Sequence, residues 1–161
     1  TIHRSGYSVN RVNGSEDYML MLTFNPCVFE FADKEIYAEP DSVVLYNKNI
    51  PQIFHSDEPY FVYDWICFDT EGDHEFLKSL NIAENTVLRY NDTEFISDLI
   101  KNMYSEFYSC SSNRTKMLDV MLKTILMKIS ESTELTETQK QNTDPHYNEL
   151  LELRDNNDMV F

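Results

Sequence analysis

The spacing of the apolar residues changes near residue 70, and this change constrains the fold of the chain more than any other feature. Before it, short β-branched and aromatic runs are separated by turn signals at intervals of roughly 8–12 residues. After it, between residues 93 and 130, apolar residues recur every three or four positions, as on one face of a helix. The 161-residue chain is therefore predicted to be an α+β protein, with an antiparallel β-barrel followed by two packed helices.

The predicted elements follow from these patterns. Strands are expected at residues 17–24, 27–31, 36–38, 42–46, 52–55 and 60–69, with a turn at Glu39-Pro40-Asp41-Ser42. Helices are expected at residues 93–108, with Thr93 as the N-cap, and at residues 114–130. Residues 131–143 lack an apolar face and are predicted to form a linker, after which Asp144-Pro145 opens a short helical stretch. The expected division is a barrel at 1–72, a helical region at 73–132, and a linker with a helical appendage at 133–161.

The strand predicted at residues 60–69 carries the clearest indication of a binding site. Phe61, Tyr63 and Trp65 alternate along it and therefore lie on one face, which a closed sheet turns toward its interior. A phenol and an indole N–H suit a pocket as well as a core, so a small-molecule site and a plain aromatic core both fit the pattern. An aromatic wall with hydrogen-bonding groups favours a carbohydrate as the ligand. The companion residues expected on neighbouring strands are Thr23, Asn25 and Phe54.

Charge and composition exclude several classes of function. With 28 acidic and 13 basic side chains the net charge is −15, which repels a polyanion such as DNA. The four histidines are scattered and the three cysteines are widely spaced, so no metal site and no disulfide framework are expected, and Cys67 is expected to be buried. Three glycines cannot form a phosphate-binding loop, and no nucleophile motif is present. The sequence therefore predicts no catalytic residue, no cofactor and a reducing, cytoplasmic location without a membrane-spanning segment.

Two further features leave alternatives open. Leu118, Leu122, Ile125 and Ile129 recur in steps of four, three and four, which fits either a helix packed on the sheet or the seam of a homodimer. Arg4 is either an arm residue that reaches across the pocket or part of an exposed terminus. Arg11 is expected to hold a turn by pairing with Asp17, a role that suits a guanidinium.

Three segments occur in an order and spacing that resemble a known family. They are residues 11–22, which begin Arg-Val-Asn-Gly, residues 39–46, and residues 63–68, which begin Tyr-Asp-Trp. Together they resemble the amino-terminal effector-binding domain of AraC-type transcription regulators. Residues 144–154 resemble the entry into the helix-turn-helix domain of the same family.

The resemblance implies a cupin-like barrel that binds an effector, followed by two helices of which the second serves dimerisation, in the bacterial cytoplasm. Matched by strand, the family's ligand-binding positions fall on Thr23, Asn25, Phe54, Tyr63 and Trp65. Where the family has Pro-Gly-Asp this chain has Pro40-Asp41-Ser42, so Asp41 must adopt the backbone conformation that glycine supplies.

The expected function is therefore ligand sensing, with a carbohydrate as the candidate effector and DNA bound only by a C-terminal domain outside this chain. Two other functions remain open at this point. One is a metal-dependent cupin enzyme such as a sugar isomerase, and the other is a dimerisation module without a ligand.

Overall fold

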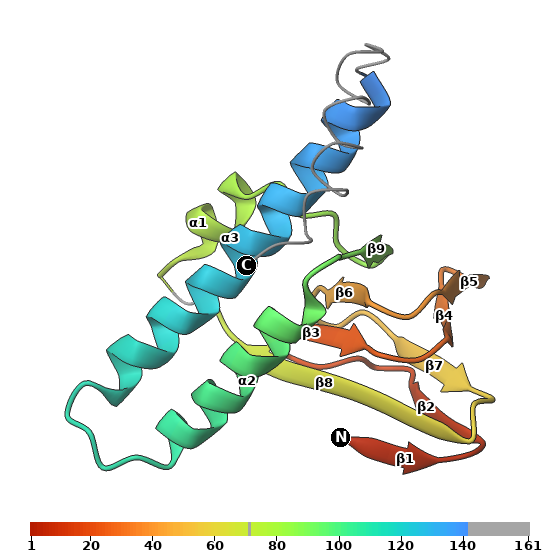
Figure 1. Ribbon diagram of the computed structural model, residues 1–161, viewed down its shortest axis with the longest axis horizontal. Helices are drawn as coiled ribbons and strands as arrows, with labels where there is room; N and C mark the ends of the chain where they lie inside the picture. Colours follow the sequence, from red (N-terminus) through yellow and green to blue (C-terminus); the bar gives the residue numbers. More distant parts are fainter. Residues whose placement is uncertain (71, 142–161) are drawn as a thin grey trace, which may run out of the picture.

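The computed structural model describes the backbone of residues 1–70 and 72–141 and the side chains of residues 1–70 and 72–132. Within these residues nine strands form two antiparallel sheets, and three helices lie on one side of them (Figure 1). The first sheet has the strand order β1-β8-β3-β6-β9 and the second β2-β7-β4-β5. The strands are β1 (Ile2–Arg4), β2 (Tyr7–Arg11), β3 (Tyr18–Thr23), β4 (Cys27–Phe31), β5 (Lys34–Ala38), β6 (Ser42–Tyr46), β7 (Gln52–Ser56), β8 (Tyr60–Phe68) and β9 (Val87–Arg89). The helices are α1 (His74–Ser79), α2 (Thr93–Phe107) and α3 (Arg114–Gln141).

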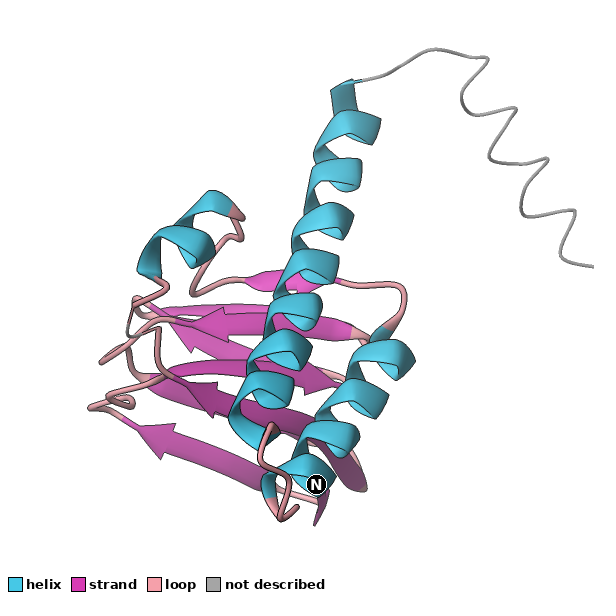
Figure 2. Cartoon of the chain, turned by 90° about the vertical axis from the view of Figure 1, so that its left-hand side faces the viewer, coloured by secondary structure: helices cyan, strands magenta, loops and turns pink. Residues whose placement is uncertain are grey.

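Strand β3 lies at the centre of the first sheet and is buried on both faces. Leu20 and Leu22 belong to a core shared with α2 and α3, whereas Met19 and Met21 belong to a second core between the two sheets. All six residues of β3 are buried, because helices cover one face and the second sheet covers the other (Figure 2). The molecule is therefore built in three layers: helices, first sheet and second sheet.

The predicted fold class is confirmed, with one difference in the arrangement of the strands. All six predicted strands are present, and the run at residues 42–46 matches β6 at both ends. The two sheets face each other instead of closing into one continuous barrel. Strands β1, β2 and β9 were not expected; they are short, and β9 interrupts the region predicted to be helical.

The edge of strand β8 explains where the first sheet stops. Strand β3 pairs with β8 from Tyr63 to Phe68, whereas β1 pairs with it only from Tyr60 to Val62. Among the described residues no strand continues β1 past this point. Trp65 and Cys67 therefore lie at an open edge, and Cys67 is exposed, so the prediction that it is buried is wrong.

The helices differ from the prediction at their ends. Asp92 caps α2, with its carboxylate accepting a hydrogen bond from the Phe95 N–H at 3.3 Å, and Thr93 is the first helical residue and not the N-cap. Helix α3 continues to Gln141, so the stretch predicted as a linker from residue 131 is helical as far as that residue. The helical stretch expected at residues 144–154 lies outside the described residues.

The apolar stripe of α3 is divided between the interior of the chain and its surface. Ile125 and Ile129 are buried in the core that α3 shares with the first sheet. The interpretation as a helix packed on the sheet is therefore correct for these two residues, which are not available to a dimer seam. Leu118 and Leu122 are partly exposed, so their place in a dimer interface stays a prediction.

The turn before β6 has the strained geometry that the sequence predicts. Asp41 has a φ of 61°, in the left-handed region that favours glycine. Its carboxylate accepts a 2.7 Å hydrogen bond from the Thr93 hydroxyl, and its backbone N–H donates to the Thr23 carbonyl oxygen at 2.9 Å. These contacts tie the turn to the start of α2 and offset the strain.

Substitutions at Asp41 separate the strain from the side-chain bond. Asp41→Ala keeps the unfavourable φ and loses the bond to Thr93, so we expect a loss of about 1–2 kcal/mol in the free energy of unfolding. Asp41→Gly loses the same bond but relieves the strain, so its free energy of unfolding should be closer to that of the wild type. Urea denaturation measures both values; an alanine variant as stable as the glycine variant would contradict this account.

Burial of Cys27 predicts a specific dependence of stability on pH. Desolvation raises the pKa of this thiol from 9.0 to about 12, so the native chain holds the proton more tightly than the unfolded chain does. The resulting stability is complete below about pH 9 and is lost as the pH rises through the native value. We therefore expect the melting temperature to fall less for Cys27→Ala than for the wild type when the pH rises from about 9 to 11. Cys110→Ala, at an exposed thiol, is the control, and parallel profiles of all three proteins would refute the prediction.

Candidate functional site

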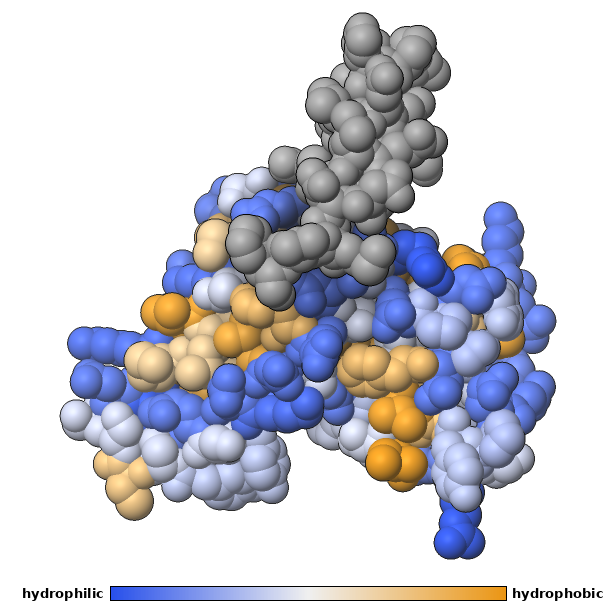
Figure 3. Space-filling view, in the orientation of Figure 1, coloured by the Kyte–Doolittle hydropathy of each residue, from blue (hydrophilic) through white to orange (hydrophobic). Residues whose placement is uncertain are grey.

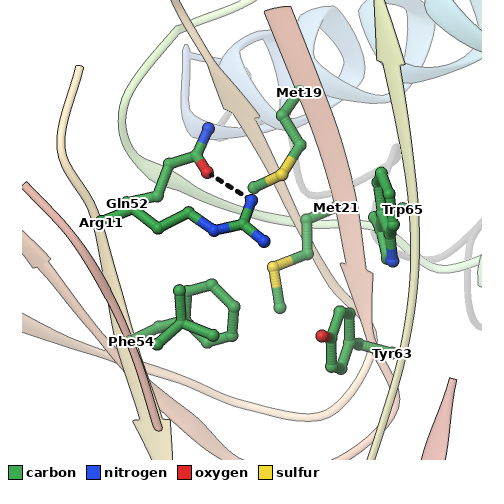
Figure 4. Close-up of a pocket in the computed structure, with 8 residues that line it drawn as sticks. Arg11, Met19, Met21, Gln52, Phe54, Tyr63 and Trp65 are labelled. Atoms are coloured by element: carbon green, nitrogen blue, oxygen red, sulfur yellow. Dashed lines mark hydrogen bonds between the residues drawn. The ribbon is translucent and has the colours of Figure 1, made fainter. Parts of the chain in front are cut away.

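A cavity lies between the two sheets, where β2 and β7 face β3 and β8 (Figure 4). We call it the inter-sheet cavity. Only about 20 Å³ of it is open to the centre of a water molecule. Small-ligand pockets usually measure roughly 300–1,000 Å³, so this cavity is narrow. Its lining residues are Val9, Arg11, Met19, Met21, Gln52, Phe54, Tyr63 and Trp65.

Three of the residues predicted to bind a ligand line this cavity together. Phe54 on β7 and Tyr63 on β8 meet edge to face, with ring centroids 5.9 Å apart. Trp65 stands opposite Met21 in the register of β8 and β3, and 46% of its surface is exposed. The alternating aromatic side chains of β8 thus face the second sheet, as expected. Phe61 and Tyr63 are buried, and Trp65 lies at the mouth of the inter-sheet cavity.

The other three predicted residues do not line the cavity. Thr23 is fully buried and stands opposite Tyr63 in the strand register. It is on the face of β3 that is turned toward the second sheet, but it lies beyond the end of the cavity. The Asn25 side chain accepts a 2.9 Å hydrogen bond from the Val62 N–H, which is a structural role at the end of β3. Arg4 is exposed on β1, so of its two open interpretations the exposed terminus is the one observed.

Two polar residues that the sequence did not single out complete the lining. Arg11 and Gln52 are directly opposite each other on β2 and β7, and Arg11 Nη1 donates to Gln52 Oε1 at 3.4 Å. Figure 4 shows the guanidinium extending from β2 toward Met19 and Met21. In the sequence, only the short alternation of Tyr7, Val9 and Arg11 could have indicated this role, because it places Arg11 on the inward face of a strand.

Arg11 makes no ion pair with a described residue. No carboxylate of the described side chains lies within 4.0 Å of its guanidinium, so the predicted pair with Asp17 is absent. The turn instead depends on Gly14, whose N–H donates to the Arg11 carbonyl oxygen at 3.0 Å. Gly14 has a φ of 64°, and a Cβ there would overlap the backbone of Ile50. The turn leaves the Arg11 side chain directed at the cavity.

The rings of His3 and Tyr7 pack against Tyr63, which lines the cavity. His3 stacks on Tyr7 with ring centroids 3.7 Å apart, and the Tyr7 and Tyr63 hydroxyls are hydrogen-bonded at 2.8 Å. Burial, and then the hydrogen bond between the Tyr63 and Tyr7 hydroxyls, raises the pKa of Tyr63 above its ordinary value. Tyr63 therefore remains a neutral phenol at physiological pH.

Several buried polar atoms near this region lack a partner. Gln52 is completely buried, and its Nε2 has no hydrogen-bond acceptor. An unpaired buried donor of this kind costs about 1–3 kcal/mol. The other unpartnered buried atoms among the described side chains are His3 Nε2, Thr23 Oγ1 and Tyr46 Oη.

A second hollow lies on the other side of β8, and we call it the helix groove. Side chains of β8, α2 and α3 line it, and about 510 Å³ of it is open to the centre of a water molecule. Figure 3 shows apolar side chains gathered between these two helices. Trp65 lines both the helix groove and the inter-sheet cavity. The groove also contains Tyr104, Phe107 and Tyr108, which are large and exposed.

Neither a metal centre nor a membrane span is found in the described part of the chain. No group of three or more His, Cys, Asp or Glu side chains there is placed to hold a metal ion. No helix there is long and apolar enough to cross a bilayer.

Solved structures share this fold, although no family profile and no curated protein matches the sequence at a significant level. The AraC-like transcriptional activator CuxR is similar over 79% of this chain and 49% of its own, with 12% identity and a TM-score of 0.56. ToxT from Vibrio cholerae strain SCE256 is similar over 81% and 55%, with 13% identity and a TM-score of 0.48. ToxT from strain O395, bound to (E)-4-(8-methylnaphthalen-1-yl)but-3-enoic acid, shows 16% identity and a TM-score of 0.46. The chain spans about half the length of these proteins. It has the fold seen in CuxR, so the AraC-type resemblance of the sequence is confirmed at the level of the fold.

Proposed function

We propose that the chain is the effector-binding domain of an AraC-type transcription regulator and that a small molecule binds in the inter-sheet cavity. The observation that carries this proposal is the convergence of Phe54, Tyr63 and Trp65 on one cavity, in a fold shared with an AraC-like activator. Aromatic walls with a few polar groups are typical of small-ligand sites. The domain binds its ligand in the cytoplasm and does not transform it.

DNA binding belongs to a part of the regulator outside this chain. The chain spans about half the length of CuxR and carries a net charge of −15, which opposes contact with a polyanion. The effector controls DNA binding only if it has different affinities for two conformations of the regulator.

Entry of a ligand requires side chains to move, because the cavity is narrow. Met19 and Met21 are flexible and adapt readily to a new neighbour. Arg11, which lies across the space toward them, is exposed and free of any ion pair among the described side chains. Movement of these three residues enlarges the cavity without disturbing the hydrogen bonds of the sheets.

Trp65 provides a route from the cavity to the helices. Its side chain is a wall of both the inter-sheet cavity and the helix groove, so a ligand that moves the indole also changes the surroundings of α2 and α3. The next residue toward the N-terminus, Asp64, accepts a 2.6 Å hydrogen bond from the Ser97 hydroxyl and links β8 to α2. The effect of the ligand therefore reaches the helices through the Trp65 side chain and through strand β8.

The helix groove is the surface proposed for homodimerisation. Leu118 and Leu122 line it and are partly exposed, and Tyr104 and Tyr108 add exposed aromatic area. Exposed aromatic and aliphatic residues gathered in one place are typical of protein–protein interfaces.

Binding at the cavity is tested through Trp65, the single tryptophan of the chain. We expect at least one compound in a screen of mono- and disaccharides and small carboxylic acids to raise the melting temperature and to change the tryptophan fluorescence. Trp65→Phe should weaken its binding about threefold and Trp65→Ala about tenfold or more, because the stacking surface is reduced or lost. Wild-type affinity in a folded Trp65→Ala variant would refute the site, and the same screen without any hit would refute effector binding.

Self-association is tested by placing a charge in the helix groove. Leu118→Asp should weaken dimerisation at least about tenfold, measured by sedimentation equilibrium, because a carboxylate would be buried at the interface. Thr115→Asp is the matched control, since it adds the same charge at an exposed position of the same helix. A monomeric wild type, or equal effects of both variants, would contradict this interface.

A further inference from the structure

We infer that the effector is a compact apolar carboxylate and that Arg11 and Gln52 bind its carboxylate group. This inference rests on the proposed function and narrows the ligand class of the same cavity. It is argued from the hydrogen-bonding capacity of the two side chains, from the chemistry of the other walls and from the size of the space.

Gln52 needs an acceptor that the described part of the protein does not supply. The residue is completely buried, its Oε1 accepts from Arg11, and its Nε2 donates to nothing. The opposite orientation of the amide would set Nε2 against the guanidinium, donor against donor, and leave Oε1 unpaired. The observed orientation is therefore the favoured one, and it leaves an unused N–H donor on a residue that lines the cavity.

Arg11 adds a positive charge with unused donors beside that amide. A guanidinium has five N–H donors, and the one described hydrogen bond of the Arg11 side chain goes to Gln52. The chain has 28 acidic side chains, yet none of the described ones pairs with Arg11. A carboxylate accepts at both oxygens and matches the fork of a guanidinium, so one oxygen can take the Gln52 N–H while Arg11 holds both.

The remaining walls favour an apolar body over a polyol. Each sugar hydroxyl needs an acceptor as well as a donor, and a buried hydroxyl without partners is costly. The lining side chains offer two good oxygen acceptors, Gln52 Oε1 and Tyr63 Oη, and both already take part in hydrogen bonds. The other walls are apolar or aromatic, namely Val9, Met19, Met21, Phe54 and Trp65.

The volume limits the size of the ligand. Only about 20 Å³ is open to the centre of a water molecule, so a ligand fits only after the movement of Met19, Met21 and Arg11 described above. A long chain would require a larger rearrangement of the walls than a single ring does. The ligand class is therefore an aromatic or alicyclic acid of about one ring.

Matched acid and amide pairs test this ligand class. The probes are benzoate, 3-phenylpropanoate and cyclohexanecarboxylate, each with its primary amide, together with D-glucose as an uncharged polyol. We expect at least one acid to bind at least about tenfold more tightly than its amide in isothermal titration calorimetry with the 161-residue chain, because the amide loses the charge-assisted bonds.

Variants of the two donors assign the contact. Arg11→Gln should weaken acid binding at least about tenfold and leave amide binding within about twofold, and Arg11→Lys should fall between, since it keeps the charge but not the fork. Arg4→Gln is the matched control, because this arginine is exposed and outside the cavity. Gln52→Met keeps the shape of the side chain without its amide. It should weaken acid binding, while the melting temperature stays equal or rises. If the glutamine had only a structural role, its replacement would lower the melting temperature.

The outcomes separate this inference from the proposed function. If D-glucose or an amide binds and changes Trp65 fluorescence while no acid binds more tightly, the sensor function stands and the carboxylate class is wrong. The same conclusion follows if an acid binds equally well to the wild type and to Arg11→Gln. If no probe binds here and the broader saccharide and acid screen also has no hit, both the inference and the proposed function fail.

Discussion

The structure depends on the burial of strand β3 from both sides. Its leucines pack under α2 and α3, and its methionines pack against the second sheet, so the strand joins two separate cores. At roughly 25 cal/mol per Å² of apolar surface, burial on both faces makes this strand a large contributor to the stability of the domain. The positions of β8 and β6, its neighbours on either side, follow from it. The helices are thereby held against the same sheet that forms one wall of the inter-sheet cavity.

The inter-sheet cavity combines features that stability alone would not select. A fully buried glutamine with an unpaired donor raises the energy of the native chain, and an arginine without a described acidic partner lies beside it. Departures from good packing and hydrogen bonding tend to collect where a protein functions. Here they lie beside flexible methionines and the only tryptophan, in one place.

Much of the fold was predictable from the sequence because its signals are local. The β-branched run at residues 42–46 correctly predicted a strand. The aromatic alternation from Phe61 to Trp65 correctly predicted which face of its strand is turned inward. Pro40-Asp41 predicted a turn with a positive φ. The ends of α3 and the pairing of β1, β2 and β9 were not predictable, because polar helices and short strands depend on tertiary contacts. Arg11 and Gln52 were missed for the same reason: they are 41 residues apart, and only the pairing of β2 with β7 brings them together. Asn25 and Thr23 do not line the cavity, because strand alternation gives the face of a residue but not its distance from the cavity.

The bond between Asp41 and Thr93 has a consequence for the kinetics of folding. It joins residues 52 positions apart and connects a turn of the first sheet to a helix that follows the whole sheet-forming region. Contacts of such long sequence separation, at the periphery of the core, tend to form after the rate-limiting step. Loss of this bond therefore acts on the unfolding limb of a chevron plot and leaves the folding limb nearly unchanged. This turn is therefore expected to contribute more to the lifetime of the native domain than to its rate of formation.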